Sequence, residues 1–196
     1  MAEESTFLPN KCGIPSFCDL EAHQIAWFAA KAFVGAGSPQ LAGGADRQQF
    51  LNLVRLTDRT IVNFVLSREE LQGYIAHRHE GDFGSLFASV SHVEAGVTAL
   101  ARCLIFAEAL MKSDTAPPVE RSELPPKPLR ERIRKLRNKI EHYDEDIAHG
   151  TIPTETMPML HVLDDRVQLT SISITWPEID VAVRLIHSLT ARLIAL

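Results

Sequence analysis

Residues 129–147 read LRERIRKLRNKIEHYDEDI, and this stretch decides the fold class. On a helix at about 100° per residue, its apolar side chains fall in one band and its polar ones in a second band on nearly the opposite side. The apolar band consists of Leu129, Ile133, Leu136, Ile140, Tyr143 and Ile147. The polar band consists of Arg134, Arg137, Asn138, Glu141 and His142. This pattern predicts an amphipathic helix that packs its apolar side on a core.

Helical periodicity recurs along much of the remaining chain. It predicts further helices at about 19–34, from about 45, from about 82 to 111, and from Pro177 onward. Ser67-Arg-Glu-Glu70 fits a capping box and predicts that a new short helix begins there and runs to about Arg78. Gly96 lies inside the helix predicted for 82–111, where glycine costs roughly 1 kcal/mol relative to alanine. A close approach by another helix, of the same chain or of a second copy, would explain it.

Three segments fall outside the helical pattern. Residues 1–17 contain Pro9, Gly13 and Pro15 and predict an irregular arm, and the five prolines of residues 112–128 predict a loop. Residues 157–175 predict a small β-hairpin that turns at Asp164-Asp165. We therefore expect a single all-α domain over 18–196, an up-and-down bundle of about five or six helices with a hairpin before the last one.

The composition limits the compartment and the ligands. The first residues, MAEESTFLPN, do not resemble a signal peptide, and the chain has no run of eighteen apolar residues. Three cysteines, an odd number, favour a reducing compartment. We expect a cytoplasmic protein that needs no membrane, metal or cofactor.

Positive charge is concentrated on one segment of an acidic protein. The net charge is −5, yet residues 127–139 hold seven basic side chains and one acidic side chain. Such clustering suits a phosphodiester substrate, and the predicted RNA-binding residues are Lys127, Arg130, Arg134 and Lys135. The alternative interpretation is a solvated helix face with i,i+4 ion pairs such as Arg137–Glu141.

The stretch RNKIEHYDE resembles the HEPN family, in which an arginine and a polar residue precede a histidine by a few positions. Arg137, Asn138 and His142 match that motif. Tyr143 departs from it, because HEPN partners of nucleotidyltransferase antitoxins have a tyrosine two residues after the histidine. The resemblance implies a helical bundle, a homodimer whose motif helices face one another, and a metal-independent endoribonuclease of toxin–antitoxin or antiviral systems.

The motif residues suit such chemistry. His142 can exchange a proton with a ribose 2′-OH or a leaving oxygen, and Arg137 can stabilise charge on phosphorus-bound oxygens. Asn138 can orient the histidine or the phosphate. RNA and an antitoxin protein are then the expected partners, and the Gly96 face and the last helix are the expected dimer contacts. The alternative function is a catalytically silent HEPN-like binding or scaffolding domain.

Overall fold

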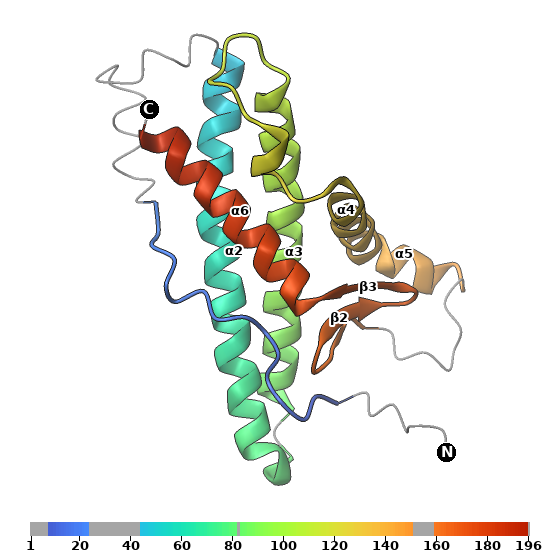
Figure 1. Ribbon diagram of the computed structural model, residues 1–196. Coiled ribbons are helices and arrows are strands. Elements are labelled where there is room, and N and C mark those ends of the chain that lie inside the picture. Colours follow the sequence, from blue (N-terminus) through green and yellow to red (C-terminus); the bar gives the residue numbers. More distant parts are fainter. Residues whose placement is uncertain (1–7, 24–43, 82, 151–158, 196) are drawn as a thin grey trace.

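Two long helices form the centre of the molecule, and shorter elements cover one side of them (Figure 1). The computed structural model describes residues 8–23, 44–81, 83–150 and 159–195. Helices α2 (Gly44–His77) and α3 (Gly84–Met111) pack along their whole lengths. Helix α6 (Trp176–Ala195) crosses this pair, and α4 (Lys127–Glu141) packs on α3. The mostly helical fold predicted from the sequence is therefore confirmed.

Helix α2 is continuous, so the prediction of a new helix at Ser67 is wrong. The Ser67 side chain is fully buried, and its hydroxyl lies 2.9 Å from the hydroxyl of Ser89 and 3.0 Å from the Ser89 carbonyl oxygen. The Ser89 hydroxyl in turn donates to the carbonyl of Ser67 at 2.9 Å. The serine therefore joins α2 to α3 and does not cap a helix.

Gly96 allows the close approach of α2 within the same chain. A Cβ atom at this position would lie 3.2 Å from the ring of Phe64, which is tighter than ordinary contact. Gly96 and its neighbours along this side of α3 are buried against α2. The expectation that the Gly96 face contacts a second copy is therefore wrong. The stripe of α6 is likewise buried, since Ile179, Val183 and Ile186 are at most 1% exposed.

The β-structure is a three-stranded antiparallel sheet, not the predicted hairpin. Strands β1 (His161–Val162), β2 (Arg166–Leu169) and β3 (Ile172–Thr175) are paired in the order of the sequence. The second turn contains Thr170 in the left-handed region, with φ of 53°. This turn splits the segment that the sequence analysis treated as one strand.

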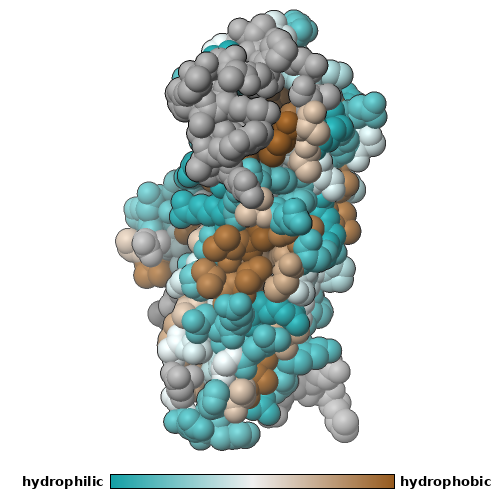
Figure 2. Space-filling view, turned by 90° about the vertical axis from the view of Figure 1, so that its left-hand side faces the viewer, coloured by the Kyte–Doolittle hydropathy of each residue, from teal (hydrophilic) through white to brown (hydrophobic). Residues whose placement is uncertain are grey.

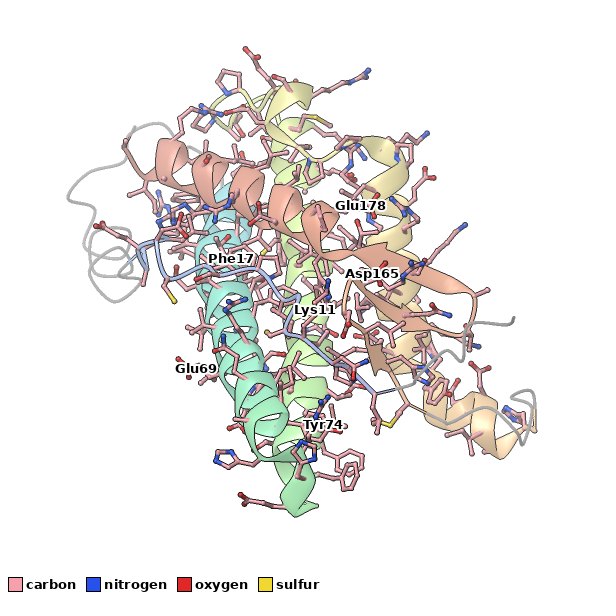
Figure 3. All side chains as sticks on the ribbon, turned by 60° about the horizontal axis from the view of Figure 1, so that its bottom comes forward. Lys11, Phe17, Glu69, Tyr74, Asp165 and Glu178 are labelled. Atoms are coloured by element: carbon pink, nitrogen blue, oxygen red, sulfur yellow. The ribbon has the colours of Figure 1, made fainter. Side chains whose placement is uncertain are left out.

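Residues 8–23 form an irregular N-terminal strap across α2 and α6 (Figures 1 and 3). Residues 8–17 have no helix or strand, and no helix begins at Asp19, because residues 18–23 form a turn and irregular backbone. The remainder of that predicted helix, 24–34, lies outside the described residues. Ile14 and Phe17 have no exposed surface, so the strap is part of the core.

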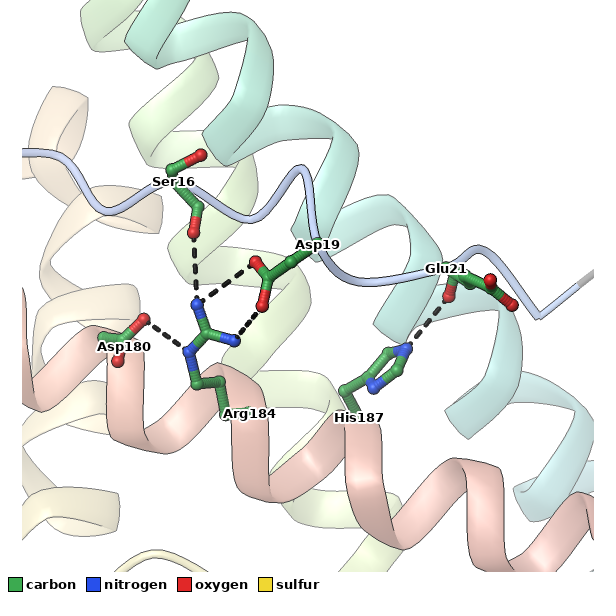
Figure 4. Close-up of polar contacts among 6 residues, drawn as sticks. All are labelled: Ser16, Asp19, Glu21, Asp180, Arg184 and His187. Atoms are coloured by element: carbon green, nitrogen blue, oxygen red, sulfur yellow. Dashed lines mark hydrogen bonds and ion pairs between the residues drawn. The ribbon is translucent and has the colours of Figure 1, made fainter.

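Polar contacts hold the strap at both ends. Arg184 of α6 donates to Asp19 at 2.6 and 3.2 Å and to the carbonyl of Ser16 at 3.2 Å (Figure 4). The hydrogen bond from Arg184 lowers the pKa of Asp19 below its usual value. At the other end, one carboxylate oxygen of Asp164 accepts from the backbone N–H groups of Asn10 and Lys11 at 2.7 and 3.1 Å. The strap therefore joins the sheet, α2 and α6.

The surface formed by α2 is hydrophilic apart from an apolar patch about halfway along it (Figure 2). The exposed large apolar side chains of α2 are Val62, at 52%, and Leu66, at 38%. Figure 2 shows the left-hand side of Figure 1, whereas α4 packs on α3 on the right-hand side. The molecule thus has an apolar surface that is separate from the motif helix.

Candidate active site

The predicted motif helix is two helices that meet at His142. Helix α4 ends at Glu141 and α5 (Tyr143–Ala148) follows, with His142 at φ −105° and ψ 11° between them. The backbone hydrogen bonds continue across the junction, because His142 N donates to Asn138 and Asp146 N donates to His142, both at 3.1 Å. The junction therefore places the histidine at a helix end, and α5 leaves it in a different direction from α4 (Figure 1).

The apolar band docks α4 as predicted, but the band weakens in α5. Leu129, Ile133 and Leu136 are at most 6% exposed. Tyr143 is also buried, and burial raises the pKa of its phenol above the usual value. Ile147, the last member of the predicted band, is 47% exposed, so its place in the core was predicted wrongly.

Arg137 is held by its neighbours on α4. Its guanidinium donates to the Asn138 side-chain oxygen at 2.9 Å and lies 2.7 Å from a carboxylate oxygen of Glu141. Glu141 also lies 3.6 Å from the guanidinium of Arg102 on α3. Asn138 therefore contacts the arginine of the motif, and Glu141 has a second cation available if Arg137 moves to another partner.

His142 is exposed and is paired with a carboxylate. Its Nδ1 atom lies 3.1 Å from Glu145 Oε2, and its side chain is 61% exposed. Because an ionised carboxylate only accepts hydrogen bonds, Nδ1 carries the proton of the neutral ring and Nε2 is the basic nitrogen. Among the described residues, no hydrogen bond joins the imidazole ring of His142 to the side chain of Arg137 or Asn138.

Most of the basic run is paired with acidic side chains. Arg130 and Arg134 both contact Glu108 of α3, at 2.8 and 2.6 Å. In the same way Arg132 contacts Glu178, Lys139 contacts Asp146 and, more distantly at 3.8 Å, Lys127 contacts Glu131. Within the described part of the chain, Lys135 is the one basic residue of the run without an ion pair. Docking of α4 therefore uses much of the charge that the sequence assigned to RNA.

The sequence analysis missed three carboxylates of this region as neighbours of the motif. Glu145 follows His142 by three residues, so helical spacing alone could have identified that contact. Glu108 and Glu178 come from α3 and α6, and only the tertiary structure brings them to α4. The pair Arg137–Glu141 was anticipated by the alternative interpretation of the polar band.

Comparisons with known proteins do not assign the chain to a family. In the described part of the chain, no helix combines the length and the apolar character needed to cross a bilayer. The likeness to HEPN proteins rests on Arg137, Asn138 and His142. No protein-family model matches the chain, and searches of curated proteins and of solved structures found no similar protein.

Proposed function

We propose that this chain is a HEPN-like, metal-independent endoribonuclease of the cytoplasm whose catalytic residues are Arg137, Asn138 and His142. The observation that carries the proposal is the state of His142. Its ring is exposed, its Nδ1 is paired with Glu145, and its Nε2 has no hydrogen-bond partner among the described residues. A histidine oriented in this way through Nδ1 has the arrangement that a general base needs.

The proposed reaction is an internal transfer of the RNA phosphate. Nε2 of His142 accepts the proton of a ribose 2′-OH, and the 2′-oxygen forms a bond to the adjacent phosphorus. The bond from phosphorus to the 5′-oxygen breaks, and that oxygen takes a proton from water or from an acid of a second copy, which leaves a 2′,3′-cyclic phosphate and a 5′-hydroxyl. Arg137 stabilises the negative charge of the transition state, while Arg102 remains to pair with Glu141.

The test is cleavage of single-stranded RNA by the purified protein in excess EDTA. We expect fragments that end in a cyclic phosphate, because the reaction uses only side chains and the 2′-OH. The matched control is the same strand with deoxyribose throughout, which lacks the nucleophile and should remain intact. Activity that disappears in EDTA and returns with magnesium would contradict the mechanism.

A second candidate function is a catalytically silent binding or scaffolding domain. The observation that favours it is the pairing of the basic run, since Arg130, Arg132 and Arg134 already contact carboxylates. Absence of cleavage, with the wild type and His142→Ala having equal effects on cell growth, would support this function. Selective toxicity of the wild type supports the ribonuclease, and rescue by a co-expressed protein would identify an antitoxin.

We further propose a homodimer in which the two motif helices face each other. A single exposed His142 has no second acid to protonate the leaving oxygen, and a two-fold partner would supply one. The apolar contact would come from Ile105 of α3, which is 46% exposed. Ile105 lies between Arg102 and Glu108, which both contact α4, so it adjoins the motif helix.

Ile105→Glu is expected to shift the protein from dimer to monomer, because it replaces the apolar contact by a charged side chain that would have to lose its water in the interface. Sedimentation at micromolar concentration measures the change from about twice 21.8 kDa to 21.8 kDa. Val62→Glu is the matched control, since Val62 is similarly exposed but belongs to the apolar patch of α2. A dimer that survives Ile105→Glu and dissociates with Val62→Glu would place the interface on α2 instead.

A further inference from the structure

A cavity of about 450 Å³ lies where the end of α3, the proline-rich loop and the first turns of α4 meet. Its size falls within the range of about 300–1,000 Å³ that small-molecule sites occupy. The basic side chains that line it are Lys112, Arg121, Lys127, Arg130 and Arg134. The acidic ones are Glu108 and Glu131. Five positive and two negative charges leave this basic cavity with a charge of +3, in a chain whose net charge is −5.

Two of the five cations have no carboxylate partner in the described part of the chain. Lys112 at the end of α3 and Arg121 in the short 3-10 helix Arg121–Glu123 are both exposed, and neither forms an ion pair with a described residue. Like charges gathered around one concave space repel each other unless an anion enters it. Lys112 and Arg121 therefore supply positive charge that the fold itself does not neutralise.

The remaining cations are fixed in position by the core of the domain. Arg130 lies 2.8 Å from Glu108 and donates to the carbonyl of Pro125 at 2.8 Å, while Arg134 lies 2.6 Å from the other oxygen of Glu108. A guanidinium has five N–H donors, so each of these arginines keeps donors that no described residue accepts. Glu108 thus holds two guanidinium groups at the cavity in a defined arrangement.

We propose that the basic cavity is a phosphate-binding site, which takes the phosphate group of a nucleotide or of an RNA chain. Rigid guanidinium groups bind phosphate oxygens through paired, charge-assisted hydrogen bonds. Three of the four residues predicted to bind RNA line this cavity, namely Lys127, Arg130 and Arg134. The site goes beyond the proposed cleavage reaction, because it would bind phosphate whether or not His142 is catalytic.

Position along α4 relates the cavity to the motif. Arg130 and Arg137 are separated by seven residues, or about 10 Å along a helix. A phosphate in the cavity would therefore be a different phosphate from the one that is cleaved. It would contribute to the affinity for RNA and not to the rate of the chemical step. Loss of the cavity is then expected to raise KM for RNA and to leave kcat largely unchanged.

The test measures binding of adenosine 5′-monophosphate by calorimetry at low salt, with adenosine as the control that lacks the phosphate. We expect adenosine to bind at least about ten-fold more weakly, and Lys112→Ala and Arg121→Ala each to weaken the nucleotide by about five-fold or more. Arg55→Ala removes an exposed arginine of α2 that does not line the cavity, so it should leave the affinity unchanged. Unaltered melting temperatures would show that the variants fold.

Competition with a six-nucleotide RNA distinguishes the two sources of phosphate, using His142→Ala protein so that the RNA stays intact. If the RNA displaces the nucleotide, the cavity binds a phosphate of RNA. If the nucleotide stays bound, the cavity binds free nucleotides. The proposal would be overturned if neither ligand binds, or if Lys112→Ala and Arg121→Ala leave the affinity unchanged. None of these outcomes depends on RNA cleavage, so the cavity and the ribonuclease are tested separately.

Discussion

His142→Ala is expected to slow RNA cleavage by at least about a hundred-fold, because general acid–base catalysis contributes about 10²–10⁴ to such rates. Arg137→Ala should cause a loss of about 10²–10³, since it removes the group that stabilises charge in the transition state. Initial rates on a fluorescent single-stranded RNA in EDTA measure both effects. The two losses should be far from additive if the residues act as one unit.

The fold should survive both substitutions. His142 is exposed, and Arg137 forms a surface pair with Glu141 that is worth at most about 1 kcal/mol. Arg55→Ala is the matched control, since Arg55 is an exposed basic residue of α2, outside the motif and outside the residues predicted to bind RNA. Equal activity of wild type, His142→Ala and Arg137→Ala would remove the motif from the mechanism.

Glu145 is a positioning residue in this scheme, because it acts on RNA only through the ring of His142. Glu145→Ala frees the ring and is expected to cost less than His142→Ala. Glu145→Gln retains an oxygen that can accept from Nδ1 and should restore part of the rate. A Glu145→Gln enzyme no better than Glu145→Ala would indicate that the carboxylate charge, not ring orientation, matters.

Phe17→Ala is expected to lower the free energy of unfolding by about 3–5 kcal/mol, the usual cost of emptying a buried aromatic site. Phe17 has no exposed surface, and its ring centroid lies 5.8 Å from that of Phe64 on α2. Urea unfolding followed by circular dichroism measures the change. Phe87→Ala makes the same substitution at a residue that is 54% exposed, so it should change stability by no more than about 0.5 kcal/mol.

Gly13→Ala provides an independent route to the same result. An added Cβ atom would lie 1.9 Å from the carbonyl oxygen of Asp164, a backbone atom that cannot move without disturbing the sheet. We expect this single methyl group to lift the strap from its site. Stability of Phe17→Ala and Gly13→Ala equal to that of the wild type would mean that the strap adds nothing to the fold.

The sequence predicts the features of this molecule that repeat along one helix. The apolar band of α4 follows from spacing alone, as does the pairing of Arg137 with Glu141. Ser67 was misread because a serine three residues before a glutamate fits a helix start and a helix interior equally well. Only the buried serine of α3, Ser89, distinguishes the two cases.

Features that join distant segments could not be predicted in this way. Glu108 holds Arg130 and Arg134 across more than twenty residues, so their use as docking groups does not appear in a local pattern. The sheet shows an intermediate case. In the sequence, the alternation of apolar and polar residues changes parity between Leu169 and Ile172, but this pattern does not reveal the left-handed turn at Thr170.

Because the chain is synthesised from its N-terminus, the strap is made long before the helix α6 that it packs against. Its residue Asp19 pairs with Arg184, which is 165 residues later, so the ribosome makes one half of this contact long before the other. At about 5–20 residues per second, the delay is on the order of ten seconds or more. During that interval Ile14 and Phe17 lack the helix that helps to cover them, and the domain cannot reach its final packing. On the proposed function, RNA cleavage would begin only after α6 has left the ribosome, which would limit the exposure of nearby RNA during translation.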